Sequence, residues 1–214
     1  MTESADYQLI KIRIALLDLI KSFFHKEPDA NRLSLWRGVV YSLSKETISI
    51  EMDQAIRELS NRLQEAGLEQ LQDEYYELFV NPFSKHKLNL NASFYRDGHN
   101  FGNTLVACRD FLKKAGIEKR GGVADPEDSL VIMLDIYQEL ILMEKKDRHR
   151  AAELEAEFLN GFLFPLAEAV EKNLYRNDYA SFYKACSRFL SAYLAMERSL
   201  TFGPSRLQSV VLTK

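Results

Sequence analysis

The sequence from Asp125 to Ile141, DPEDSLVIMLDIYQELI, predicts a helix and favours an all-helical fold. Asp125 is a good N-cap residue, and Pro126 suits the first helical position because a missing N–H costs nothing there. Two acids follow in the first turn, where the helix dipole favours negative charge. From Leu130 onward, apolar residues return at helical spacing. The stretch therefore predicts a helix that starts at Asp125.

Apolar residues recur at spacings of three, four and seven along most of the remaining chain, which is typical of amphipathic helices. The residues that form these faces are Tyr7, Ile10, Ile14, Leu17 and Phe24; Leu33, Trp36, Val40 and Leu43; Met52, Ile56, Leu59 and Leu63; Leu71, Tyr75 and Leu78; Leu105, Cys108, Phe111 and Leu112; Leu154, Phe158 and Phe162; and Phe182, Ala185, Phe189, Tyr193 and Met196. No run of useful length alternates with the period of two that a half-buried strand shows. We therefore predict an all-α, bundle-like domain of about eight to ten helices.

The helical pattern is interrupted at three places. A proline and two glycines within Asn81–Asn103 predict a long loop after the fourth helix. Gly121 and Gly122 predict a flexible connection. Pro165, inside an apolar run, predicts a kink or break. After it, Asp178 is expected to cap the last helix.

The length of 214 residues is enough for one substantial core. A single domain over residues 1–204 is the simplest expectation, with a tail at 205–214. Within that domain we expect an N-terminal lobe at about 1–120, a hinge at 121–128 and a C-terminal lobe at 129–204. A hinge between helical lobes is compatible with a monomer or with a domain-swapped homodimer.

Composition argues against several classes of partner. The net charge of -3 gives no overall attraction to nucleic acid. The apolar runs at 130–134 and 158–166 are too short or too interrupted to span a membrane. Residues 1–6 are acidic and polar, unlike a signal peptide, so we expect a cytoplasmic protein. Cys108 and Cys186 lack CxxC spacing and are expected to be reduced, buried thiols.

The sequence carries none of the common catalytic signatures. The phosphate-binding loop, the dinucleotide fingerprint, the zincin helix and the nucleophile elbow are all missing. No histidine has a glutamate three residues before it, as a di-iron bundle requires. We therefore expect no catalytic residues, no metal and no cofactor. The alternative is a helical metal-dependent enzyme that uses His86 and His99 with Asp135 and Glu139.

Three segments carry a family resemblance. Glu74–Pro82, EYYELFVNP, resembles the YxxLFxGP signature of the TorD-like chaperones, which include the DmsD and NarJ types. Asp125–Leu130, DPEDSL, resembles the E-P-x-D-H-[IL] hinge motif of that family. The sequence from Phe158 through Pro165 to the DYASFY segment at 178–183 is similar to the last two helices of the family. Order and spacing agree over nearly the whole chain, which therefore resembles a divergent member.

Some positions depart from the family pattern. Asn81 stands where the signature has glycine, although asparagine is the next most tolerant residue for a left-handed backbone. Ser129 replaces the usual hinge histidine, and Met133 occupies a position often filled by glutamate. Gly161 falls near the place of another histidine. The role of the hinge histidine therefore does not transfer to this chain.

The resemblance implies that the chain binds the precursor of a molybdoenzyme catalytic subunit until its cofactor is inserted. The bound segment would be a twin-arginine signal peptide or another part of that subunit. A pair of arginines followed by an apolar stretch requires carboxylates beside apolar or aromatic surface. The candidate client-binding residues are Tyr75, Phe79, Pro82, Phe94, Tyr95, Asp125, Pro126, Glu127 and Asp128. They would form one surface if the long loop folds back beside the hinge.

Other roles stay open for these residues. Asp125 and Pro126 would also be selected for capping alone. Tyr75 and Phe79 lie at helical spacings that suit a core. Aromatic residues of the loop, such as Phe94, have no periodic reason for burial and are better candidates for binding. A regulatory interaction module unrelated to redox enzymes is a further alternative.

Overall fold

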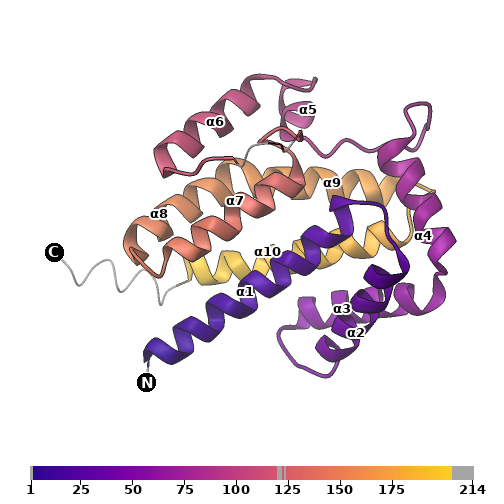
Figure 1. Ribbon diagram of the computed structural model, residues 1–214, viewed down its shortest axis with the longest axis horizontal. Helices are drawn as coiled ribbons and strands as arrows, with labels where there is room; N and C mark the ends of the chain where they lie inside the picture. Colours follow the sequence, from indigo (N-terminus) through magenta and orange to yellow (C-terminus); the bar gives the residue numbers. More distant parts are fainter. Residues whose placement is uncertain (1, 120–121, 123, 204–214) are drawn as a thin grey trace. The chain divides into compact units, whose positions relative to one another are not determined.

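The computed structural model describes residues 2–119, 122 and 124–203, and these residues form an all-helical fold (Figure 1). The elements are α1 (Thr2–His25), α2 (Ala30–Leu43), α3 (Ile50–Glu65), α4 (Leu68–Tyr75), the π-helix η1 (Tyr76–Val80), α5 (Ala92–Asp97), α6 (Asn103–Ala115), α7 (Leu130–Met143), α8 (Arg148–Phe158), the π-helix η2 (Leu159–Leu163), α9 (Phe164–Arg176) and α10 (Phe182–Phe202). The predicted all-α class and the predicted number of helices are confirmed. Gly121 and the predicted tail at 205–214 lie outside the described residues.

Contacts between Cα atoms divide the described chain into two compact units. The first unit comprises residues 2–17, 90–166 and 194–203, and the second unit comprises 18–89 and 167–193. Each unit therefore combines segments from both sides of the predicted hinge. The division into an N-terminal and a C-terminal lobe at that hinge stays a prediction.

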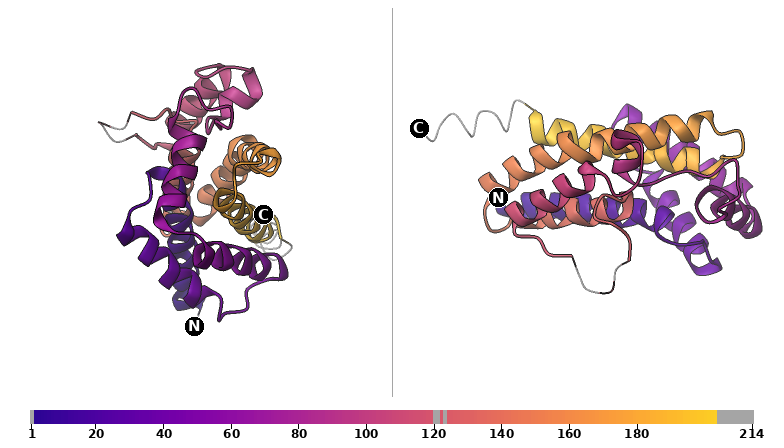
Figure 2. Two further views of the ribbon diagram at one scale, coloured as in Figure 1. Left: turned by 90° about the vertical axis from the view of Figure 1, so that its right-hand side faces the viewer. Right: turned by 90° about the horizontal axis from the view of Figure 1, so that it is seen from above.

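The first unit is built around α7. Of its fourteen residues only Glu139 is exposed, because the helix is apolar on almost every side. It packs against α8 and η2 (Figure 1 and Figure 2). Phe111 of α6 adds a tilted ring contact with Phe158 at 5.2 Å between ring centroids. The core of this unit is therefore assembled from helices before and after the predicted hinge.

A buried arginine lies in the same unit. The guanidinium of Arg13 on α1 contacts the carboxylates of Glu144, Glu155 and Glu197, and the phenol of Tyr137 donates to Glu197 at 2.6 Å. Burial opposes the charge of Arg13, but Glu197, with Tyr137 and Glu155, more than compensates and raises its pKa well above the ordinary value. One side chain thus connects α1, α7, α8 and α10.

The second unit has an aromatic core. The Trp36 ring stacks on Phe182 with centroids 5.6 Å apart, and Phe23 packs edge-on against both rings. The indole N–H of Trp36 donates to Ser22 Oγ at 2.8 Å, so its polar atom is satisfied. The prediction that Trp36 is a core residue is confirmed, since its side chain is fully buried.

The predicted start of α7 is wrong. The helix begins at Leu130 rather than at Pro126, and its N-cap is Ser129, whose hydroxyl accepts from the N–H of Ile132. The preceding residues do not join the helix because their backbone groups bond elsewhere. The carbonyl of Asp128 accepts from the N–H of Ala92 at 2.9 Å.

The prediction of a continuous loop at Asn81–Asn103 is also wrong in its second half, because that half contains the short helix α5.

The prediction that Asp178 caps the last helix is wrong as well. Helix α10 begins at Phe182, and Glu74 caps it from α4. The distortion expected around Pro165 is present as the π-helical turn η2, which directly precedes α9.

Candidate functional site

The loop before α5 folds back beside the hinge segment within the first unit. Residues 90–92 run antiparallel to 128–130 and form an isolated β-bridge between Asn91 and Ser129. Its two backbone hydrogen bonds join Leu130 N to Leu90 O at 2.8 Å and Ala92 N to Asp128 O at 2.9 Å. This pairing places the start of α5 next to the DPEDSL segment.

Asp128 is fully buried in this arrangement. Its Oδ2 accepts from the backbone N–H of Ser93 at 2.8 Å and so caps the start of α5. Its Oδ1 has no hydrogen-bond partner among the described residues. A carboxylate in this position orients α5 against the hinge and is not accessible to an external ligand.

Glu127 is half-buried, with 14% of its side chain exposed, and it forms an ion pair with Arg109 of α6. The Nε and Nη2 atoms of Arg109 both lie 3.0 Å from Glu127 Oε2. Burial tends to raise the pKa of Glu127, but a backbone N–H and Arg109 together hold it below the ordinary value. The carboxylate is therefore charged and close to the surface.

Asp125 is exposed, and Pro126 is half-buried. The ammonium of Lys119 donates to the backbone carbonyl of Asp125 rather than to its carboxylate. Of the three hinge acids, Asp125 is thus the most accessible, Glu127 is partly accessible and Asp128 is structural.

The Cys108 thiol lies beneath this segment and donates to the carbonyl of Glu127 at 3.4 Å. Burial raises its pKa to about 12, with a further contribution from the Asp128 charge. A thiol with this pKa stays protonated at neutral pH and is a poor nucleophile.

Helix α5 presents aromatic residues beside the hinge. Phe94 is 42% exposed, and its ring meets Tyr95 edge to face with centroids 5.3 Å apart. Tyr95 is half-buried, and burial raises its pKa to about 12. Arg96 donates to the carbonyl of Gly161 at 2.7 Å, where the π-helical turn η2 interrupts regular helical bonding. This contact holds α5 against the body of the first unit.

The turn from α5 to α6 exposes Phe101, which our sequence analysis did not select. The N–H of Phe101 donates to Ser93 Oγ at 3.2 Å, and Asp97 Oδ2 accepts from the N–H of Thr104 at 2.8 Å. A Cβ atom on Gly102 would lie 2.4 Å from that Asp97 oxygen, so glycine is required there. The only signal in the sequence was the pair of glycines that flank this turn.

The EYYELFVNP segment belongs to the second unit. Tyr75 and Phe79 are half-buried, and Phe79 packs on Tyr183 with centroids 4.9 Å apart. Pro82 is exposed. Asn81 has φ of -61°, so the left-handed backbone considered for it does not occur. Its amide instead donates to Glu77 at 2.9 Å, a bond that glycine cannot make.

The predicted client-binding residues therefore fall into two groups. Phe94, Tyr95, Asp125, Pro126, Glu127 and Asp128 belong to the first unit, and Tyr75, Phe79 and Pro82 belong to the second. Within the first unit, the structure brings the hinge and α5 together. Within the second unit, Tyr75 and Phe79 contribute mainly to the aromatic core.

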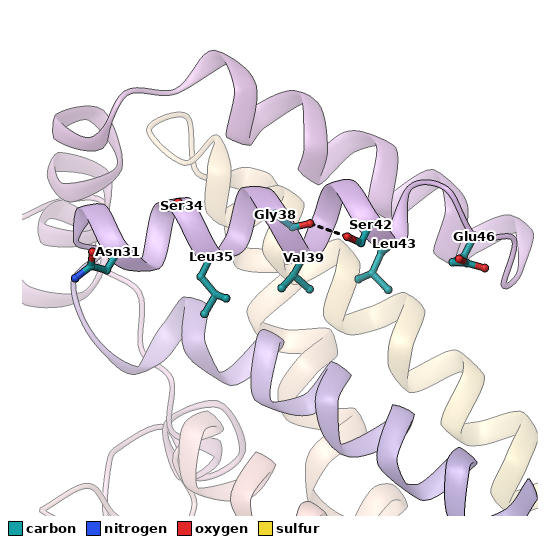
Figure 3. A pocket seen from close by; sticks show the side chains of 8 residues that line it. All are labelled: Asn31, Ser34, Leu35, Gly38, Val39, Ser42, Leu43 and Glu46. Carbon is teal, nitrogen blue, oxygen red and sulfur yellow. Dashed lines mark hydrogen bonds between the residues drawn. The ribbon is translucent and has the colours of Figure 1, made fainter.

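A further apolar surface lies on α2 in the second unit. Leu35, Val39 and Leu43 project from the same side of the helix, along an open groove (Figure 3). The Ser42 hydroxyl donates to the carbonyl of Gly38 at 3.1 Å and so stays bound to its own helix. Because a single helix lines it, the groove offers a contact surface and does not enclose a small molecule.

The histidines considered for a metal site have other surroundings. His86 stacks on Tyr179 with ring centroids 5.0 Å apart, and His99 contacts the carbonyl of Asn100. Within residues 2–119, 122 and 124–203, no group of three or more His, Cys, Asp or Glu residues has a geometry that could hold a metal ion.

None of the helices in the described part of the chain is both long enough and apolar enough to cross a membrane.

Comparison with known proteins gives a family match. The nitrate reductase delta subunit family model matches residues 45–171, more than half of the chain, and this range includes both the EYYELFVNP and the DPEDSL segments. The solved structures that match include a candidate redox enzyme maturation protein from Archaeoglobus fulgidus. That match has 20% sequence identity and a TM-score of 0.48 and covers 84% of this chain and 94% of the other. No curated protein matches the chain in sequence at a significant level. The chain belongs to the nitrate reductase delta subunit family, a family of redox enzyme maturation chaperones of the NarJ and TorD type.

Proposed function

We propose that this protein binds a segment of a molybdenum-cofactor oxidoreductase subunit in the cytoplasm and holds it before assembly or twin-arginine export. The observation that carries the proposal is the family match, which spans both the EYYELFVNP and the DPEDSL segments. Holding the subunit in this way would assist insertion of its cofactor. The protein would act by reversible binding, without a catalytic centre of its own.

The chemistry of the hinge surface supports this proposal. A twin-arginine segment presents two guanidinium groups followed by an apolar stretch. Arginine pairs favourably with carboxylates, and the apolar stretch requires exposed apolar surface. In the first unit, the exposed Asp125 and the partly exposed Glu127 supply negative charge, and Phe94 supplies aromatic surface on α5, which is bonded to the hinge at Asp128.

The site we propose is centred on the accessible members of the predicted set. Asp125, Glu127 and Phe94 would contact the client, with Pro126 and Tyr95 shaping the surface around them. Asp128 would act indirectly, because its carboxylate holds Ser93 and thus the start of α5. Tyr75, Phe79 and Pro82 belong to the second unit and are proposed as a separate client contact.

Purification of the tagged protein together with its partners from the native cytoplasm tests the proposal. The tagged chain is purified under mild conditions, its partners are identified by mass spectrometry, and its metal content is measured. We expect a molybdoenzyme catalytic subunit to be recovered with a metal-free chaperone. Stoichiometric metal on the chain, with no such subunit, would contradict the proposal and favour a metal-dependent enzyme. A partner without any relation to redox enzymes would favour a regulatory module.

A further inference from the structure

The stability of the fold does not explain why position 101 carries a phenylalanine. Phe101 has φ of 63°, and among the described residues it is the only one other than glycine with a positive φ. A large side chain is strained in this region, which Gly, Asn and Asp occupy far more readily. The ring is 70% exposed, so burial does not offset the strain.

The turn around Phe101 is fixed by groups that do not involve the ring. Ser93 Oγ accepts from the N–H of Phe101, and the Asp97 carboxylate fills the space beside Gly102 while it caps α6. All of these contacts would be kept if Asn stood at position 101. The backbone is thus held in a left-handed conformation whatever the side chain, and the aromatic ring is an addition that the turn does not need.

The ring lies in a particular neighbourhood of the first unit. Ser93, which binds the N–H of Phe101, also donates its own N–H to Asp128 of the hinge. Phe94, the residue after Ser93, is itself exposed. One serine therefore connects two exposed aromatic residues to the segment that carries the exposed Asp125 and the partly exposed Glu127.

We propose that Phe101 is a client-contact residue, which packs against the apolar part of the bound segment. The partner that fits is a peptide whose basic residues meet Asp125 and Glu127 and whose following apolar side chains cover Phe101 and Phe94. Charge complementarity selects this occupant, because Ser93 ties the aromatic residues to the hinge segment that carries the exposed Asp125 and the partly exposed, Arg109-paired Glu127. Backbone strain is often retained at binding sites, where it is part of function. The inference rests on the proposed function and adds a specificity-determining residue to it.

The test is a comparison of affinity and stability in one variant. Phe101→Asn removes the ring and relieves the backbone strain. Binding is measured by fluorescence anisotropy with a labelled synthetic peptide that has two adjacent arginines followed by a run of leucine and alanine. We expect the dissociation constant to rise about tenfold, the effect of losing one aromatic anchor. We expect Tm to stay constant or to rise by up to about 4 °C.

A matched control is Tyr175→Ala, which removes a 78% exposed aromatic ring from α9 in the second unit. It should bind the peptide as the unmodified chain does. Unchanged affinity of Phe101→Asn would overturn the inference while leaving the proposed function intact. Loss of affinity together with a lower Tm would assign the ring to the fold and would also overturn it. If the unmodified chain fails to bind the peptide, the proposed binding function and this inference fall together.

Discussion

Asp125 and Asp128 are only three residues apart, yet their carboxylates have different surroundings. Asp125 is exposed, whereas Asp128 is fully buried and accepts a hydrogen bond from Ser93. The sequence predicted Asp125 as the N-cap and Asp128 in the first turn of the same helix. The difference arises because Asp128 bonds to a residue 35 positions earlier in the chain. A local pattern of charges does not contain that information.

For Asp128 we predict a loss of stability. Asp128→Ala leaves the buried N–H of Ser93 without an acceptor, which costs about 1–3 kcal/mol of unfolding free energy. Asp128→Asn should cost less, because its amide oxygen still accepts that bond. Urea denaturation of the three proteins gives both differences. Equal stability of Asp128→Ala and the unmodified chain would show that the cap at Ser93 has no energetic role.

For Asp125 we predict the opposite behaviour. Asp125→Ala should weaken binding of an arginine-containing client peptide several-fold, while stability changes by less than about 0.5 kcal/mol, as is usual for an exposed side chain. Asp178→Ala, which removes an exposed acid from the second unit, is the matched control and should leave binding unchanged. If both substitutions weakened peptide binding equally, binding would depend only on the overall charge of the protein and not on the position of Asp125.

At the scale of helices, the starts of α5, α6 and α10 depend on carboxylates that do not directly precede the helix but come from another element or from the hinge. Asp128 caps α5, Asp97 caps α6, and Glu74 caps α10. Apolar periodicity predicted most helices correctly, because burial of one face is a local property of the sequence. It failed for the start at Asp178, because Glu74 of α4 caps α10, and for the start at Asp125, because the backbone of Asp128 pairs with Ala92 and the helix begins only after Ser129. It also missed α5, which has only six residues and is defined by contacts with the hinge.

The strongest of these caps is predicted to be Glu74. Its two oxygens accept from the backbone N–H groups of Ser181, Phe182 and Tyr183 at 2.7–3.1 Å. Glu74→Ala would leave these donors without their acceptor at the start of α10, and we expect a loss of roughly 3 kcal/mol. Chemical denaturation measures this loss, and Glu69→Ala, which removes an exposed acid from the same helix α4, serves as the control. A loss no larger than that of the control would contradict the capping role.

The Asp97 cap should make stability depend on pH. The N–H of Thr104 holds the pKa of Asp97 below its ordinary value of 3.8. A carboxyl group with a lowered pKa stabilises the folded state above its unfolded pKa, and this contribution is lost as the pH falls through the lower folded value. The Tm difference between the unmodified chain and Asp97→Asn should therefore be constant near neutral pH and shrink below 3.8. If the Tm difference did not change with pH, the charge of Asp97 would not be the source of its stabilising effect.

At the scale of the whole molecule, the all-α class and the family were both predictable from the sequence. Of the three segments that carry the family resemblance, the family match covers those at 74–82 and 125–130 completely and ends within the third, at residue 171. The composition of the compact units was not predictable, because each unit combines segments that are distant in sequence. Arg13 illustrates the reason. In the sequence it is one charge that interrupts an apolar stripe, whereas in the fold it is the buried partner of three carboxylates.

Removing this arginine should destabilise the first unit strongly. Arg13→Met leaves Glu155 and Glu197 buried without their counter-charge, and breaking a buried ion pair in this way costs about 3–5 kcal/mol. Adding Glu155→Gln and Glu197→Gln to the same variant removes the two fully buried negative charges and should restore part of the loss. Thermal unfolding of the single and triple variants measures both effects. A triple variant less stable than Arg13→Met would show that these carboxylates are not the source of the penalty.

The positions of the two cysteines allow the compact units to be followed separately in solution. The chain has only two, Cys108 in the first unit and Cys186 in the second, and both are buried. Burial raises the pKa of both thiols, so each resists a thiol reagent until its surroundings open. The two labelling rates, assigned by peptide mass, therefore report how often each unit opens in the unmodified protein. Protection of Cys108 alone on addition of a client peptide would locate the binding event in the first unit without any substitution or attached probe.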